Sequence, residues 1–222
     1  MDEINIHKII RSSRRTLALV ITPDARLLVR APFLLPEQKI RDFIRKKINW
    51  VRQKQAIAQS QAKSSAPKQY INGDKFWVLG QLYPLKIIEE GVIRLTDALE
   101  FPSNLLPQAK AHLLGWYKAQ AQKVISERAR SIAKSLGMQY SSARVNSAMK
   151  RWGSCGPKGT LNFSWRLVMA PWEVIDYVVT HEIVHLSERN HSMRFWGKVK
   201  SAFTGYAQCK DWLNKHGHLL VL

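Results

Sequence analysis

The chain has 222 residues, of which 45% are hydrophobic, and this is enough for one large globular domain or two small ones. Its 35 Lys and Arg residues outnumber 16 Asp and Glu residues, and the formal charge of +19 favours partners that carry phosphate or acidic groups. Two cysteines, Cys155 and Cys209, are too few for a disulfide framework. The sequence has no apolar run of about 18 residues, and Asp2 and Glu3 replace the basic start of a signal peptide. We therefore expect a cytoplasmic protein that does not enter a membrane.

Residues 1–100 predict a β-rich region that contains one basic amphipathic helix. Residues 16–21 and 26–30 are β-prone runs around a turn at 22–25, and we expect them to form a hairpin. A helix is expected from Glu37 to Gln61, because apolar residues recur at three- and four-residue steps opposite Arg and Lys. A linker and a second antiparallel sheet follow, and we expect this sheet to join the first. The linker is 59–68, and the expected strands are 76–79, 82–88 and 92–95.

Residues 101–222 predict a second domain, in which a long helix precedes two strands and a further helix. The long helix is expected at 105–136, and the two strands at 143–146 and 160–165. Polar residues alternate with apolar ones in the second strand, and we expect the edge that carries Asn162 and Ser164 to align an extended substrate. The predicted fold class is α+β.

The sequence H-E-x-x-H, followed by five residues and a third histidine, lies in the last of these helices. His181 and His185 are four residues apart and therefore share one helix face, where both imidazoles can bind one metal ion. A turn after His185 can return His191 to the same ion. Glu182 lies about 100° further round the helix than His181, where it can act as general base on water held by the metal. Three histidines and one open position are what a catalytic zinc site needs.

Four linked motifs resemble the YgjP-like metallopeptidase family, which is related to the WLM and SprT/Spartan zincins. The motifs are Arg151-Trp152-Gly153-Ser154-Cys155, Leu161 to Leu167, Val178 to Leu186, and Asn190-His191-Ser192 with Phe195-Trp196. The resemblance covers nearly the whole chain. It implies a β-rich N-terminal region followed by a minimal zincin-like catalytic domain. It also implies a metal site made by His181, His185 and His191, with Glu182 as base, as the spacing itself predicts.

Arg151 precedes the metal-binding helix and is a second candidate catalytic residue. Its guanidinium can stabilise negative charge that develops during hydrolysis, and Lys150 can do the same. A surface ion pair or a hydrogen bond that fixes the turn is the competing interpretation of Arg151. Both interpretations are kept open by the sequence.

Three functions compete at this point. The first is a metallopeptidase that acts on peptides or proteins with Zn²⁺, or with another divalent ion such as Ni²⁺ or Mn²⁺. The second is a nucleoside triphosphate pyrophosphatase of the UTP type, in which Arg151, Lys150 and Lys158 hold phosphates. The third is a DNA-associated protease or a DNA-binding module that uses the basic N-terminal helix. Three imidazole ligands favour the first, and the sequence does not predict an oligomeric state.

Overall fold

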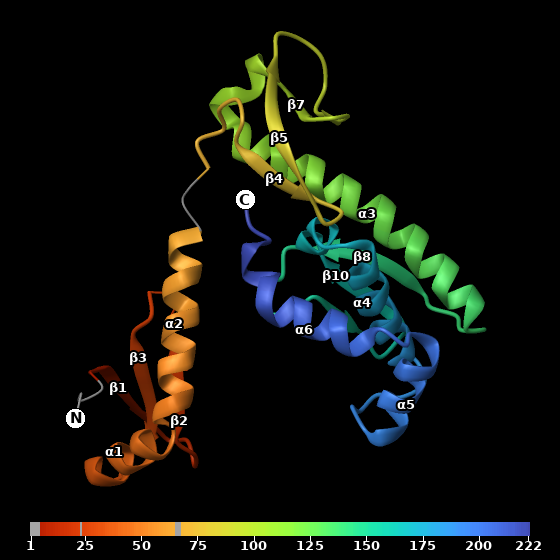
Figure 1. Ribbon diagram of the computed structural model, residues 1–222. Helices are drawn as coiled ribbons and strands as arrows, with labels where there is room; N and C mark the ends of the chain where they lie inside the picture. The colour runs from red at the N-terminus through yellow and green to blue at the C-terminus, as the bar shows by residue number, and fades with distance from the viewer. Residues whose placement is uncertain (1–4, 23, 65–67) are drawn as a thin grey trace. The chain divides into compact units, whose positions relative to one another are not determined.

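The computed structural model describes residues 5–22, 24–64 and 68–222, and these form two compact units, Met1–Ala66 and Pro67–Leu222. Both units mix helices with small sheets, so the predicted α+β class is confirmed (Figure 1). The domain boundary expected at residue 100 falls inside strand β7 (Leu99–Pro102) of the second unit. That residues 101–222 alone form the catalytic domain stays a prediction. Within the described ranges, the helices are too short or too polar to cross a membrane.

The first unit is a three-stranded sheet with two helices packed on one face. Its elements are β1 (Ile6–Ser12), β2 (Ala18–Ile21), β3 (Leu27–Pro32), α1 (Glu37–Lys46) and α2 (Ile48–Ser64). The expected hairpin is present, since β2 pairs antiparallel with β3, although Pro23 of its turn lies outside the described residues. Strand β1, which periodicity did not reveal, pairs parallel with β3.

The N-terminal helix predicted from Glu37 to Gln61 is two helices, so that prediction was wrong. The backbone of Lys47 (φ −111°, ψ 15°) leaves the helical region and separates α1 from α2. Ile40 and Ile44 of α1 and Val51 of α2 are buried together against the central strand β3. The break therefore lets two short helices cover one small sheet. Helix α2 continues to Ser64, through much of the predicted linker, and residues 65–67 lie outside the described part of the chain.

The second sheet belongs to the second unit and packs on the first half of a long helix. Its elements are β4 (Lys75–Val78), β5 (Gln81–Ile88), β6 (Arg94–Leu95), β7 (Leu99–Pro102), a 3₁₀ turn (Ser103–Gln108) and α3 (Ala109–Ser135). The strand order is β4-β5-β7-β6, and β5 runs parallel to β7, whereas a wholly antiparallel sheet was expected. Ala109 and Leu113 of α3 are buried with Phe76 and Leu85 of this sheet. Apolar contact with α3 thus places the sheet in the second unit.

The second half of α3 packs on the third sheet and on the helix that carries the H-E-x-x-H motif (Figure 1). These elements are β8 (Ser142–Asn146), β9 (Gly153–Cys155), β10 (Thr160–Ser164), α4 (Trp172–Val184), α5 (Met193–Ala202) and α6 (Tyr206–His216). The strand order is β8-β10-β9. Strand β10 is central, so Asn162 and Ser164 do not offer a free edge, and that expectation was wrong. On the outer side of β8, the Gln122 side chain accepts from the Val145 amide at 3.1 Å, which leaves β9 as the other edge.

An ion pair joins α3 to α4 and yields a test of the packing. Arg128 donates twice to the Asp176 carboxylate, at 2.6 and 2.7 Å, with side-chain exposures of 34% and 20%. We expect Arg128→Ala to lower the free energy of unfolding by about 1 kcal/mol, because it leaves a partly buried carboxylate without its partner. Urea denaturation measures the change. Arg130→Ala, at an exposed position on the same helix, is the control and should change the free energy by less than about 0.5 kcal/mol.

Candidate metal centre and catalytic cleft

Helix α4 holds His181 and His185 one turn apart because its other faces are buried. Its valines and isoleucines are at most 4% exposed, and Pro171 precedes its first turn. The turn between β4 and β5 contacts Pro171: Gly80 (φ +83°) approaches so closely that an added Cβ would lie 2.8 Å from the proline Cα. The start of α4 is thus fixed by the neighbouring sheet.

The chain turns after His185 and brings His191 back to the end of α4. The His185 Nδ1 atom lies 2.9 Å from the Glu188 carbonyl oxygen, and Glu188 pairs with Lys198 of α5 at 3.0 Å. Arg189 donates to the carbonyl oxygens of Gly156 and Pro157, at 2.9 and 3.0 Å. These bonds hold the loop on one side against α5 and on the other against the turn between β9 and β10.

The three imidazoles converge through their Nε2 atoms. The Nε2 atom of His191 lies 3.0 Å from that of His181 and 3.2 Å from that of His185. Two ligand nitrogens of a tetrahedral zinc site with bonds of about 2.0–2.1 Å lie about 3.3 Å apart. The spacing of the cluster therefore fits a metal ion of this size. In the described part of the chain, no second group of three His, Cys, Asp or Glu side chains comes together in this way.

The protonation of the cluster also suits a metal ligand. The Nδ1–H of His185 can donate to the Glu188 carbonyl, which leaves Nε2 as the atom with a free lone pair. Burial, followed by the charges of His185, His191 and Lys210, lowers the pKa of His181 to about 4. Burial also lowers the pKa of His185. Both rings are therefore neutral at neutral pH, as metal binding requires. Phe195 of α5 fills the space behind the cluster, with its ring centroid 4.4–4.8 Å from the three imidazole centroids.

Glu182 is buried beside the cluster, at 5% exposure, in a space that strand β9 leaves for it. A Cβ added to Gly153 would lie 2.6 Å from both Cγ and Oε1 of Glu182. Burial raises the pKa of Glu182 to about 8, and the positive charge of Arg151 opposes this shift. A bound cation would act in the same direction as Arg151. Glu182 is thus a carboxylate that can accept and hold a proton close to neutral pH.

Two hollows flank His181 and Glu182. One, of about 310 Å³, is lined by all three histidines together with Glu182, Arg151, Arg189 and residues 153–155 of β9. The other, of about 250 Å³, is lined by Trp152, Gly153, Tyr177, Val178, His181, Glu182, Lys210, Leu213 and Asn214. Strand β9 borders both hollows through Gly153. An extended chain that lies along β9 would therefore pass both hollows with His181 and Glu182 between them.

The structure brings together all five of the site residues named from the sequence. His181, Glu182, His185, His191 and Arg151 line one hollow, whereas Lys150 and Lys158 are absent from its lining. The role of each remains a prediction.

The sequence indicated no role in the site for Gly153, Phe195 or Arg189, although all three contact it. Gly153 and Phe195 lie in the quoted family motifs, and this was the one signal that pointed to them.

A buried helix with two histidines and a glutamate, followed by a third histidine, is typical of metal-dependent hydrolases. This chain belongs to the YgjP-like family, since the family profile described as "YgjP-like, metallopeptidase domain" matches residues 15–216. The protein is thus a peptidase that depends on a divalent metal.

Two crystal structures show a partial likeness. The metallopeptidase zymogen abylysin of Pyrococcus abyssi is 22% identical over 39% of this chain and 89% of its own, with a TM-score of 0.37. The metallopeptidase zymogen jannalysin of Methanocaldococcus jannaschii is 20% identical over 44% of this chain and 97% of its own, also with a TM-score of 0.37. A comparison with curated proteins gave no match.

The close approach of Gly153 to Glu182 yields a test of the site geometry. We expect Gly153→Ala to keep the metal but to lower kcat/KM by at least about tenfold, because the new methyl group displaces the Glu182 carboxylate. Metal analysis and rate measurement on the same sample check both parts. Gly197→Ala, in open space on α5, is the matched control and should leave the rate unchanged. A Gly153→Ala enzyme as active as wild type would contradict the contact.

Proposed function

We propose that this protein hydrolyses peptide bonds at a site in which His181, His185 and His191 bind one Zn²⁺ ion and Glu182 is the general base. The observation that supports it most is the convergence of three Nε2 atoms beside a buried carboxylate, with that of His191 3.0 Å from that of His181 and 3.2 Å from that of His185. Neutral imidazoles select Zn²⁺ or Ni²⁺ over Mg²⁺, which prefers oxygen ligands. When bound, the ion supplies Lewis-acid chemistry, by which it polarises a carbonyl and acidifies water.

Glu182 supplies the proton transfers in this proposal. Its carboxylate takes a proton from the attacking water and later gives it to the amine that leaves, so that one side chain acts first as base and then as acid. Burial favours the first step, because it raises the affinity of the carboxylate for the proton.

Arg151 lines the same hollow, is exposed, and has no ion-pair partner among the described residues. This leaves its guanidinium available to meet negative charge that develops on the carbonyl oxygen.

Strand β9 offers the substrate an edge. With β10 on its inner side, the backbone of residues 153–155 can pair on its outer side with an extended peptide. This replaces the alignment along Asn162 and Ser164 that the sequence suggested. A substrate in this position would lie across the two hollows, next to Glu182.

The ligand assignment predicts how much metal each variant retains. Wild-type protein should contain close to one divalent ion per chain, whereas His181→Ala and His185→Ala should lose most of it, because two ligands make too weak a site. Elemental analysis of the dialysed proteins measures this. His112→Ala is the control, since His112 lies outside the cluster, and it should retain metal as wild type does. Equal metal content in all four proteins would exclude the assignment.

The role of Glu182 predicts the activity of its amide variant. Glu182→Gln should keep the fold and the metal but lower kcat by about a thousandfold or more, since the amide preserves shape and cannot accept a proton. A protein mixture and a nucleotide panel, each incubated with and without chelator, provide the assay. Chelator-sensitive release of pyrophosphate without cleavage of any protein would favour the pyrophosphatase instead. Full activity of metal-loaded Glu182→Gln would show that another group is the base.

A further inference from the structure

The hollow of about 250 Å³ next to His181 and Glu182 has an unusual distribution of polar groups. Its inner wall is apolar: Tyr177, Val178 and Leu213 are 6%, 4% and 9% exposed. At its rim lie one ammonium group, of Lys210, and one amide, of Asn214. Glu182 carries the one carboxylate among its lining residues, and that group belongs to the reacting centre. The hollow therefore presents a single positive charge above an apolar wall.

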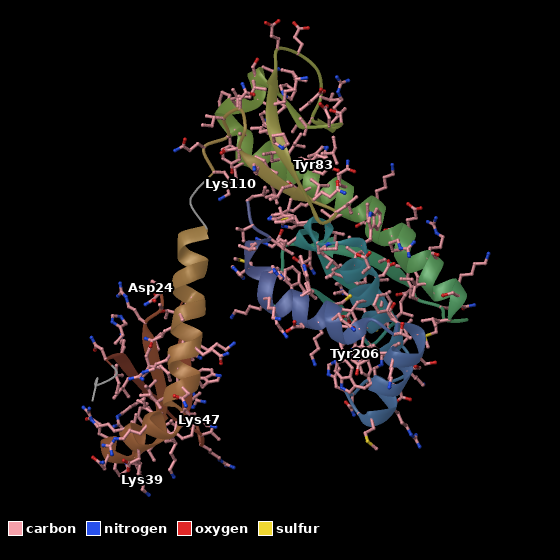
Figure 2. The ribbon with its side chains drawn as sticks, in the orientation of Figure 1. Asp24, Lys39, Lys47, Tyr83, Lys110 and Tyr206 are labelled. Atoms are coloured by element: carbon pink, nitrogen blue, oxygen red, sulfur yellow. The ribbon has the colours of Figure 1, made fainter. Side chains whose placement is uncertain are left out.

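Lys210 is held at this place by aromatic side chains. Its Nζ atom lies 4.6 Å from the ring centroid of Trp196, and Trp196 lies 5.8 Å from the His181 ring. Tyr206, at the start of α6 (Figure 2), supports Trp196 in turn. The two rings stack with their centroids 5.7 Å apart. This aromatic base lowers the freedom of a long side chain and keeps its charge near the metal ligands.

The charge of Lys210 is not neutralised within the described part of the chain. The ion pairs there include Lys215 with Asp211, on the same helix, at 2.7 Å, but none that involves Lys210. Trp152 also lines the hollow, and Gly217 lets its indole approach closely: a Cβ at Gly217 would lie 2.6 Å from the Trp152 ring. A ligand that enters this space meets the ammonium group at the rim and apolar walls further in.

We propose that this hollow is a specificity subsite that binds the carboxylate of a substrate residue next to the scissile bond, with Lys210 as the residue that selects it. The proposal rests on the peptidase function proposed above and adds a substrate class to it. A glutamate side chain fits the hollow, since its methylene groups can lie against Leu213 and Tyr177 while its carboxylate reaches Lys210 and Asn214. A triphosphate would call for more donors, such as an arginine fork, than one ammonium and one amide supply.

Matched peptides test the proposal. The cleavage site is first located by mass spectrometry on digests of a protein mixture, and amidated peptides then vary only the residue next to the scissile bond among Glu, Gln and Lys. Wild type should prefer Glu over Gln by about threefold to tenfold in kcat/KM, mostly through KM, and added salt should weaken the preference. A peptide with a neutral residue and a free C-terminal carboxylate at that place distinguishes a chain end from an acidic side chain as the source of the carboxylate.

Two variants assign the preference to Lys210. Lys210→Glu should reverse it, so that the Lys peptide becomes the better substrate. Lys200→Glu makes the same change of charge at an exposed position of α5 outside the hollow, and it should keep the wild-type order. Binding to metal-loaded Glu182→Gln, followed by fluorescence anisotropy, should give Kd values in the same order as the wild-type KM values.

The outcomes separate the subsite from the peptidase function. Cleavage by wild type without preference for Glu, or equal behaviour of the two lysine variants, would overturn the subsite and leave the peptidase function standing. Neither cleavage nor binding of any peptide would overturn both. Loss of nucleoside triphosphate hydrolysis in Lys210→Glu, with no effect on peptides, would assign the hollow to phosphate instead and also overturn the proposal.

Discussion

The Nε2 atom of His191 must meet those of His181 and His185, at 3.0 and 3.2 Å, and much of the second unit serves this requirement. Burial lowers the pKa of His181 and of His185 and so keeps these two rings neutral at neutral pH. They also need fixed orientations. The Glu188 carbonyl orients His185, and the ring of Phe195 fixes the space behind all three histidines. A loop of few residues can return His191 to the cluster only because bonds to α5 and to the β9–β10 turn hold it in place.

Strand β9 joins this metal centre to the substrate in the proposed mechanism. Its Gly153 leaves room for the buried Glu182 side chain, and its outer edge is the one on which an extended chain can pair. Gly153 lines both hollows, and the other two residues of the strand line the larger one. A single short strand can thus fix the distance between the general base, the scissile bond and the subsite at Lys210. Such an arrangement makes the rate sensitive to small changes in β9 that leave metal binding intact.

Local patterns predicted much of this protein, and contacts between distant residues account for most of what they missed. His181, His185 and His191 lie within eleven residues, so their spacing alone indicated a cluster. Strand β9 has three residues that include a glycine, too few for an alternating pattern. The break at Lys47 has neither Pro nor Gly to mark it. The parallel pairing of β1 with β3 depends on contacts between distant residues, which the β-propensity of one short segment does not predict. The contact of Gly153 with Glu182 exists only after β9 packs on α4.

A crystal structure of the zinc-loaded protein would show whether the three histidines hold one metal ion. Anomalous diffraction measured on both sides of the zinc absorption edge locates the ion independently of any interpretation of the site. We expect one strong peak per chain, bonded to the Nε2 atoms of His181, His185 and His191 at about 2.0–2.1 Å, with an open coordination position that faces Glu182. A fully loaded crystal whose zinc peak lies elsewhere, or is bonded to fewer than three of these atoms, would contradict it.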